Sequence, residues 1–207
     1  MSRPLGILIS GRGSNMVALV EALREGTAAH PVIVLSNRPE AGGLARAEAL
    51  GVPTSVVDHR AYPDRESFER AMDARLREAG AELVAHAGFM RILTPWFARA
   101  WASRMLNIHP SLLPLWPGLD THAKALAAGV ALHGCTVHEV TEALDGGPIL
   151  GQAAVAVRPG DTEETLAARV LAQEHRLYPM VLQAFARDPE AARTRPVALF
   201  GAETPAL

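Results

Sequence analysis

The stretch LGILISGRGSN (residues 5–15) decides the class of fold. Its first six residues form a short, mostly apolar run, and Gly11 and Gly13 interrupt the chain just before a helical pattern at 16–25. This order is typical of the first strand, turn and helix of a parallel α/β sheet. It repeats along the first half of the chain, with β-type runs at 32–36, 54–57 and 83–87 and helical patterns at 41–50 and 65–79. Continuous apolar strands separated by helices predict a parallel sheet covered on both faces.

The second half has a different pattern. Pro110, Pro114 and Pro117 predict a long structured loop after an apolar run that begins at Met105. A helical stretch at 121–128 follows, and two alternating segments, 134–140 and 149–157, are expected to pair in antiparallel fashion. A long helix is predicted over 163–185, capped by Asp161 or Thr162, and the residues from Asp188 onward are expected to form a loose strap.

The predicted fold class is therefore α/β. It is a Rossmann-like, mostly parallel sheet flanked by helices, with an antiparallel extension in the C-terminal half. A single domain is expected over 1–207, with one half at about 1–100, a second at about 101–187 and a tail at 188–207.

Composition excludes several classes of protein. The chain has 207 residues, 49% of them hydrophobic, and its 20 basic and 22 acidic residues give a formal charge of −2. These values fit a globular protein and argue against a nucleic-acid partner, which requires a basic surface. Cys135 is the only cysteine, so no intrachain disulfide forms, and the N-terminal apolar run is too short to span a bilayer. We expect a cytoplasmic protein with no membrane partner.

The glycine-rich turn at 10–15 is the first candidate site. Its backbone N–H groups and the start of the following helix can bind an anion, most naturally a phosphate. The spacing matches neither the dinucleotide fingerprint nor the Walker loop. The alternative is a tight turn between a strand and a helix with no ligand.

A second candidate combines three residues of different chemistry. Asn107 and His109 lie on the same side of a predicted strand, where both side chains can donate hydrogen bonds to one developing oxyanion. Asp145 lies in the turn LDGGP (residues 144–148), and a carboxylate beside His109 would orient the imidazole and raise its pKa. The alternative is a core histidine and two ordinary turn residues, because sequence spacing does not show that Asp145 meets His109.

A metal site is the rival interpretation of the remaining histidines. His122, His133 and His138 could join His109 and either Asp120 or Asp145 as ligands. The chain contains neither a His-Glu-x-x-His nor a Cys-x-x-Cys motif, so we predict no metal. We interpret His138 and Cys135 as structural or pocket-lining residues, and His86 and the tryptophans as packing residues.

Taken together, these motifs resemble those of the folate-dependent formyltransferases. The shared motifs are NIHPSLLP (107–114), Pro117-Gly118, Thr121-His122 and LDGGP (144–148). Three further stretches are similar to the phosphoribosylglycinamide formyltransferases within that superfamily: ISGRGSN (9–15), AGFMRIL (87–93) and QEHRLYP (173–179). The resemblance covers about residues 5–178. Where some relatives carry a histidine in a mobile loop, this chain has Asp120.

The resemblance implies transfer of a formyl group from 10-formyltetrahydrofolate to the amine of glycinamide ribonucleotide. It assigns catalysis to Asn107, His109 and Asp145, and it assigns the ribonucleotide to Gly13, Ser14, Asn15 and Glu174. The implied folate contacts are Arg65, Arg91, Ile92, Leu93, Asn107, Val140 and Asp145. The first half would bind the ribonucleotide phosphate and the second would bind folate and carry out catalysis.

The same resemblance implies no metal and no tightly bound cofactor, because 10-formyltetrahydrofolate acts as a cosubstrate. The partners are then small molecules, and the chain is a monomer or homodimer. The alternative reaction is hydrolysis, as in the similar formyltetrahydrofolate deformylases. Those relatives carry a regulatory domain, and the tRNA formyltransferases carry an extra C-terminal domain. We expect room for neither in 207 residues.

Overall fold

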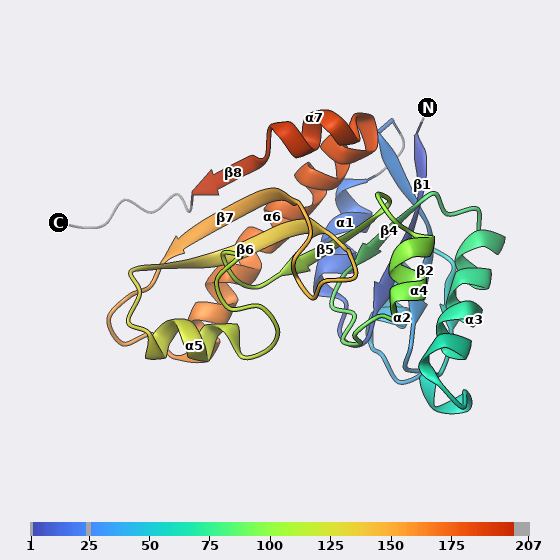
Figure 1. Cartoon of the computed structure of the whole chain (residues 1–207), viewed down its shortest axis with the longest axis horizontal. Helices are drawn as coiled ribbons and strands as arrows, with labels where there is room; N and C mark the ends of the chain where they lie inside the picture. The colour runs from blue at the N-terminus through green and yellow to red at the C-terminus, as the bar shows by residue number, and fades with distance from the viewer. Residues whose placement is uncertain (1, 24–25, 201–207) are drawn as a thin grey trace.

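One eight-stranded sheet organises the protein, in the order β3-β2-β1-β4-β5-β6-β7-β8 (Figure 1). The computed structural model describes residues 2–23 and 26–200. The strands are β1 (Arg3–Ile9), β2 (Ala29–Ser36), β3 (Thr54–Val56), β4 (Leu83–His86), β5 (Met105–His109), β6 (Leu132–Glu139), β7 (Ile149–Ala156) and β8 (Val197–Phe200). The first five in spatial order run parallel, β6 is antiparallel to both β5 and β7, and β7 pairs in parallel with β8. This arrangement confirms the predicted fold class.

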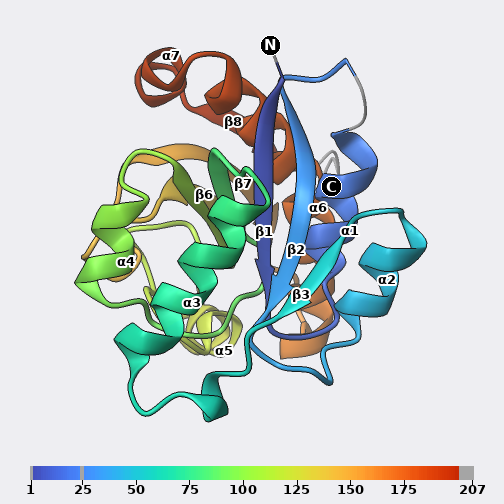
Figure 2. The same cartoon turned by 90° about the vertical axis from the view of Figure 1, so that its right-hand side faces the viewer.

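Helices cover both faces of the sheet (Figure 2). One face carries α1 (Ser14–Ala22), α2 (Gly43–Ala49) and α6 (Glu163–Arg187), and the other carries α3 (Arg65–Glu78) and α4 (Pro95–Ala100). The remaining helices are η1 (His59–Ala61), α5 (Thr121–Ala127) and α7 (Pro189–Thr194).

The sheet separates two hydrophobic clusters. Ile7 and Ile9 of β1 pack with α1, α2 and α6, whereas Leu8 faces α3 and α4. Successive side chains of a strand point to opposite faces, so the apolar run at 5–9 supplies both layers. Ligand-binding residues are therefore expected at the ends of the strands. The carboxyl ends of the parallel strands β1, β4 and β5 lie side by side in the sheet.

The long helix α6 begins as predicted. Thr162 is its N-cap and forms a reciprocal capping box with Thr165: the Thr165 N–H donates to Thr162 Oγ1 at 3.3 Å and the Thr162 N–H donates to Thr165 Oγ1 at 2.9 Å. Helix α4 has no counterpart in the sequence prediction. Glu25, at the end of the predicted first helix, lies outside the described residues.

The predicted loose strap after Asp188 is wrong for residues 189–200. This segment forms α7 and the edge strand β8. Arg193 of α7 forms hydrogen bonds to both carboxylate oxygens of the buried Glu139 on β6, at 2.6 and 3.1 Å. Strand pairing and this ion pair hold the segment, and both partners lie far from it in sequence. Residues 201–207 lie outside the described part of the chain.

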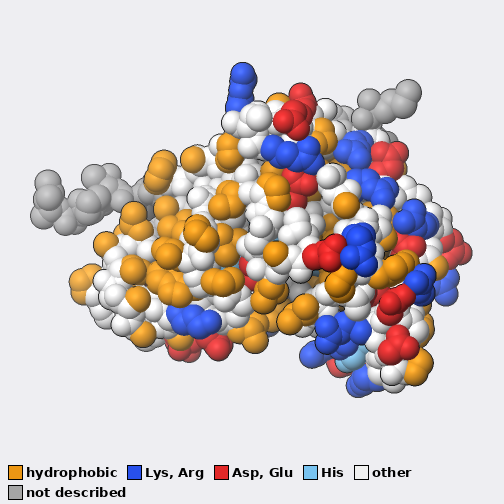
Figure 3. Space-filling model, in the orientation of Figure 1, with side chains coloured by type: hydrophobic (Ala, Val, Ile, Leu, Met, Phe, Trp, Pro, Cys, Tyr) orange, Lys and Arg blue, Asp and Glu red, His pale blue; other side chains and the backbone are white. Residues whose placement is uncertain are grey.

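The surface differs between the two sides of the view in Figure 3. Hydrophobic side chains gather over β6, β7 and α5, whereas charged side chains gather over α3 and α4. Among the described helices, none combines the length and the apolar character needed to cross a membrane.

Candidate active site

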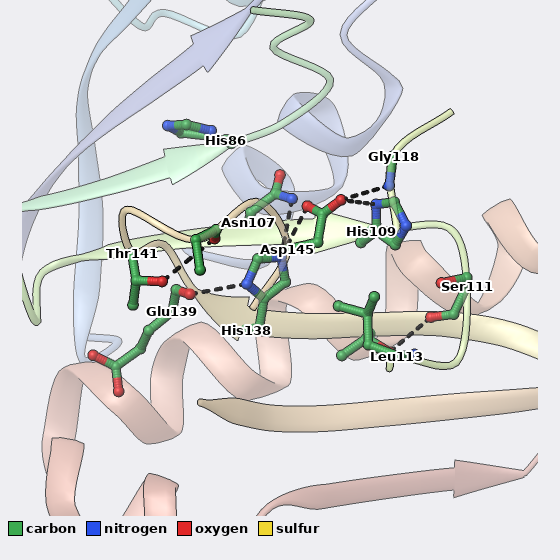
Figure 4. A network of polar contacts seen from close by, with 12 residues as sticks. His86, Asn107, His109, Ser111, Leu113, Gly118, His138, Glu139, Thr141 and Asp145 are labelled. Atoms are coloured by element: carbon green, nitrogen blue, oxygen red, sulfur yellow. Dashed lines mark hydrogen bonds and ion pairs between the residues drawn. The ribbon is translucent and has the colours of Figure 1, made fainter. Parts of the chain in front are cut away.

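Asn107, His109 and Asp145 meet beside β5 (Figure 4). Asn107 and His109 come from alternate positions of β5, and Asp145 enters from the turn between β6 and β7. The distance from His109 Nδ1 to Asp145 Oδ2 is 3.5 Å. His138, paired with Asn107 across the sheet, lies between the other groups: its Nε2 is 3.2 Å from Asn107 Nδ2 and 3.6 Å from Asp145 Oδ1. The structure thus brings together the three residues that sequence spacing could not place.

The backbone around Asp145 aims its carboxylate at the histidines. Asp145 adopts a left-handed conformation with φ of 50°, which aspartate tolerates better than most residues. Gly147 allows the turn to approach β6, because a Cβ there would lie 1.9 Å from the carbonyl oxygen of Glu139. A side chain at Gly147 would therefore push the turn, and Asp145 with it, away from β6.

Asp145 is held as a carboxylate. Burial opposes its ionisation, but the polar contact with His138, the hydrogen bond from the Gly118 N–H and the charge on His109 outweigh burial and lower the pKa of Asp145 below 3.8. The Gly118 N–H donates to Asp145 Oδ2 at 2.8 Å. The site therefore contains an ionised carboxylate whose side chain is only 9% exposed.

Carbonyl oxygens fix protons on both histidines. The Trp116 carbonyl accepts from His109 Nε2 at 2.9 Å, and the Glu139 carbonyl accepts from His138 Nδ1 at 2.9 Å. When His138 is neutral, its Nε2 accepts one Asn107 Nδ2–H, and the second Nδ2–H of Asn107 stays available to a substrate. Only when His138 is protonated does its Nε2 carry a hydrogen directed at Asp145 Oδ1. Because the Nε2–H is held by the Trp116 carbonyl, the Nδ1–H is the proton that His109 can offer to a substrate oxygen, and it lies 3.5 Å from Asp145 Oδ2. The cluster thus offers two adjacent donors for an oxyanion and a carboxylate that can take a proton.

The proline-rich loop 110–120 is attached to the sheet. Thr136 of β6 donates its hydroxyl proton to the Ser111 carbonyl at 2.7 Å and accepts the Leu113 N–H at 3.0 Å. Trp116 has φ of 52°, unusual for a bulky residue, and its carbonyl receives the His109 proton. The role of Trp116 is thus to place a backbone acceptor as well as to pack.

The glycine-rich turn also has a specific geometry. Gly13 has φ of 70° and precedes α1, and a Cβ there would lie 3.1 Å from the Cα of Gly43. The Gly43 N–H donates to the Gly11 carbonyl at 3.0 Å, which draws the N-termini of α1 and α2 together. The backbone N–H groups at the start of α1 point out of the carboxyl edge of the sheet, as an anion site requires.

The structure brings together two of the predicted ribonucleotide residues that are distant in sequence. Asn15 Nδ2 donates to Glu174 Oε2 at 2.7 Å. Burial raises the pKa of Glu174, and the Asn15 hydrogen bond partly opposes this effect. Asn15 Oδ1 is buried and has no hydrogen-bond partner among residues 2–23 and 26–200. The pair therefore leaves an unused acceptor for a ligand.

The predicted folate residues lie around the turn that follows β4. Leu93 and Val140 pack against the same hydrophobic cluster, and Ile92 is 61% exposed. The Arg91 guanidinium lies over the Phe68 ring, 5.4 Å from its centroid. Arg65 begins α3, and within residues 2–23 and 26–200 no hydrogen bond or ion pair joins it to Asn107, His109 or Asp145.

Three other histidines, His86, His122 and His133, have no carboxylate ion-pair partner in the described structure. His122 Nδ1 and His133 Nε2 are 3.1 Å apart. Burial, then the charges of His122 and His109, lowers the pKa of His133 to about 4. Burial, then the charge of His138, lowers the pKa of His86 to about 3. Over the described ranges, no group of three or more His, Cys, Asp or Glu side chains is arranged to hold a metal ion.

Sequence reasoning missed three contributors to the cluster. It interpreted His138 as a structural or pocket-lining residue, and it gave no role to the Gly118 N–H or to Thr136. Alternation along the segment 134–140 places Thr136 and His138 on one face, which was the available signal. The register that brings this face to Asn107 and His109 depends on strand pairing.

A family match agrees with this geometry. The formyl transferase family matches residues 5–182. The chain belongs to the formyl transferase family. The match covers β1 to β7 and ends within α6, so it includes the whole polar cluster, whereas α7 and β8 lie beyond it.

Relatives within the formyl transferase family cover most of the chain. Phosphoribosylglycinamide formyltransferase from Escherichia coli is 45% identical over 181 residues, which is 87% of this chain and 85% of that protein. The crystal structure of phosphoribosylglycinamide formyltransferase from Brucella melitensis has a TM-score of 0.86 and 53% identity, covering 90% of this chain and 96% of that one. The bovine trifunctional purine biosynthetic protein adenosine-3 is 49% identical over 180 residues, and the chain spans only 18% of its length.

Proposed function

We propose that this protein transfers the formyl group of 10-formyltetrahydrofolate to the amine of glycinamide ribonucleotide. The products are formylglycinamide ribonucleotide and tetrahydrofolate, and the reaction belongs to purine biosynthesis. The observation that carries the proposal is the convergence of Asn107, His109 and Asp145 in a member of the formyl transferase family. The names of the relatives from Escherichia coli and Brucella melitensis support the choice of acceptor.

The reaction forms one carbon–nitrogen bond and breaks another. The neutral amine of the acceptor attacks the formyl carbon, and the formyl oxygen gains negative charge. The Asn107 Nδ2–H and a protonated His109 donate to that oxygen. Asp145, 3.5 Å from His109 Nδ1, stabilises the imidazolium. The amine loses its proton to Asp145 through water, and N10 of the folate leaves with that proton, which Asp145 returns through the same water.

The two substrates approach from different strand ends. The ribonucleotide phosphate binds the N–H groups of Gly13, Ser14 and Asn15 at the start of α1. The Asn15–Glu174 pair, with its unused acceptor Asn15 Oδ1, receives the hydroxyl groups of the sugar.

The folate lies on the other side of the catalytic cluster. Its ring system rests against Arg91, Ile92, Leu93 and Val140, and Arg65 is available to its acidic tail. Ile92 is 61% exposed, and covering this apolar side chain with a flat ring would make the free energy of binding more favourable. Folate acts as a cosubstrate, so the proposal requires no tightly bound cofactor.

An assay with and without the acceptor tests the proposal. Purified protein is mixed with 10-formyltetrahydrofolate, and tetrahydrofolate and formate are followed separately. We expect tetrahydrofolate to form only when glycinamide ribonucleotide is present. Equal tetrahydrofolate formation in its absence, with release of formate, would instead identify a deformylase.

A further inference from the structure

Glu69 is a buried carboxylate on α3 that the proposed reaction does not use. The residue is 1% exposed. Glu69 Oε1 accepts the Thr94 N–H at 2.8 Å, and Oε2 accepts the Thr94 hydroxyl in a short hydrogen bond. Within the described residues, no ion pair joins Glu69 to a lysine, arginine or histidine. Both carboxylate oxygens therefore take their hydrogen bonds from a single residue in another segment, and the charge of Arg65, one turn earlier on α3, also favours the ionised form of Glu69 by lowering its pKa.

This contact does not serve the ordinary capping of α4. Thr94 is the N-cap of that helix, yet its side chain makes no cap hydrogen bond, and its hydroxyl donates to Glu69. Burial raises the pKa of Glu69, and the two hydrogen bonds from Thr94 oppose this rise. A buried carboxylate is costly to place, and here its hydrogen bonds fix the position of Thr94.

Thr94 ends the irregular turn that bears three of the proposed folate contacts. At the other end of this turn, the Met90 N–H donates to Ser10 Oγ at 2.9 Å, and the Ser10 hydroxyl donates to Asn37 Oδ1 at 2.6 Å. Residues 91–93 thus span the distance between an anchor at Ser10, which directly follows β1, and an anchor on α3. Phe68, the neighbour of Glu69, lies beneath the Arg91 guanidinium, so α3 contacts the turn at two points.

We propose that Glu69 is a positioning residue of the donor site, which acts through Thr94 to hold the wall formed by Arg91, Ile92 and Leu93. This inference rests on the proposed function. Because Glu69 touches neither substrate nor the catalytic cluster, its loss affects donor binding and leaves acceptor binding and the chemical step unchanged. A loosened wall must be ordered each time the donor binds, which weakens the affinity.

Glu69→Gln tests the inference with little change in shape. It removes one acceptor and places an N–H donor opposite the Thr94 donors. We expect the KM for 10-formyltetrahydrofolate and the Kd for tetrahydrofolate, measured by calorimetry, to rise about 10-fold. The kcat and the KM for glycinamide ribonucleotide should stay within about 2-fold of wild type. Thr94→Ser keeps both hydrogen bonds and should behave like wild type, whereas Thr94→Val loses the hydroxyl and should resemble Glu69→Gln.

Asp73→Asn is the matched control on the same helix. Asp73 accepts the Trp101 Nε1–H at 3.0 Å and pairs with Arg77 at 2.7 Å, away from the turn. It should affect Tm without changing either the KM or the Kd for folate. The inference is overturned if Glu69→Gln lowers Tm but leaves the Kd for tetrahydrofolate unchanged, or if both substrates lose affinity equally. A wild-type protein that binds tetrahydrofolate but transfers no formyl group would overturn the proposed function alone, and one that binds no tetrahydrofolate would overturn both.

Discussion

Four buried histidines on the central strands β4, β5 and β6 form two pairs with different surroundings. His109 and His138 are 5% and 2% exposed, and both face Asp145 at 3.5 and 3.6 Å. His86 and His133 are 5% and 0% exposed and face no carboxylate in the described structure. Burial alone does not distinguish the pairs. The carboxylate does, because it can stabilise an imidazolium.

The two pairs differ in whether an imidazole can hold an extra proton. Burial and neighbouring histidines keep His86 and His133 neutral, with pKa values of about 3 and about 4. At the other pair, the protonated form has a compensating charge in Asp145, whose own pKa is lowered. For this reason we propose His109, and not His86 or His133, as the histidine that takes part in the reaction.

The largest expected effect comes from removing an oxyanion donor. His109→Ala and Asn107→Ala should each lower kcat by about 10²–10³-fold, since each removes a hydrogen bond to the developing charge. Steady-state kinetics with both substrates saturating provide the measurement. His122→Ala is the matched control, because His122 contacts His133 and not Asp145. Near-normal kcat in a folded His109→Ala protein would contradict the proposal that the histidines facing Asp145 differ in function from His86 and His133.

A smaller effect is expected at the proposed ribonucleotide site. There the buried carboxylate of Glu174 pairs with Asn15, and in the described structure no ion pair joins it to a histidine. Glu174→Ala should raise the Kd for glycinamide ribonucleotide about 10–100-fold, since Glu174 and its partner Asn15 supply the acceptors for the sugar. The affinity for the folate should change little. Calorimetric titration with each substrate gives both values. A greater loss of folate affinity would mean that the two subsites have been exchanged.

The smallest effect on turnover is expected at His133. His133→Gln should change kcat by less than about 3-fold. The substitution should instead change the free energy of unfolding, because the pKa of His133 is 6.5 in the unfolded chain and about 4 in the folded protein. Between these values the unfolded chain binds a proton that the folded chain does not, so His133 makes stability fall as pH drops from 6.5 to 4.

Chemical unfolding of wild type and His133→Gln across that pH range measures the difference. The variant should lose less stability on acidification than wild type does. If the two proteins lose the same amount, His133 does not remain neutral in the folded state.

The sequence predicts the fold where local pattern suffices. Apolar runs locate β1, β2, β4 and β5, and the capping residues locate the start of α6. It fails at α7 and β8, where no strong periodicity exists. There, pairing with β7 and the Arg193–Glu139 ion pair decide the structure. Contacts between residues 54 positions apart leave no local signal.

The sequence predicts which residues form the candidate site, but it does not predict all the contacts between their side chains. Alternation places Asn107 and His109 on one face, and the DGGP turn singles out Asp145. The contact of Asp145 with both histidines depends on the register of β5 with β6 and on the left-handed backbone at Asp145. The part played by His138 follows from the same register, so it could not be read from a single strand.

Transfer of a labelled formyl group tests the central claim most directly. 10-Formyltetrahydrofolate carrying isotope in the formyl carbon is mixed in a single turnover with excess protein and glycinamide ribonucleotide, using wild type and Asp145→Asn. The account predicts that the label appears on the ribonucleotide with wild type and that Asp145→Asn slows its appearance by about 10²–10⁴-fold while the protein still binds both substrates. Label released as formate, or transfer at the wild-type rate by Asp145→Asn, would contradict it.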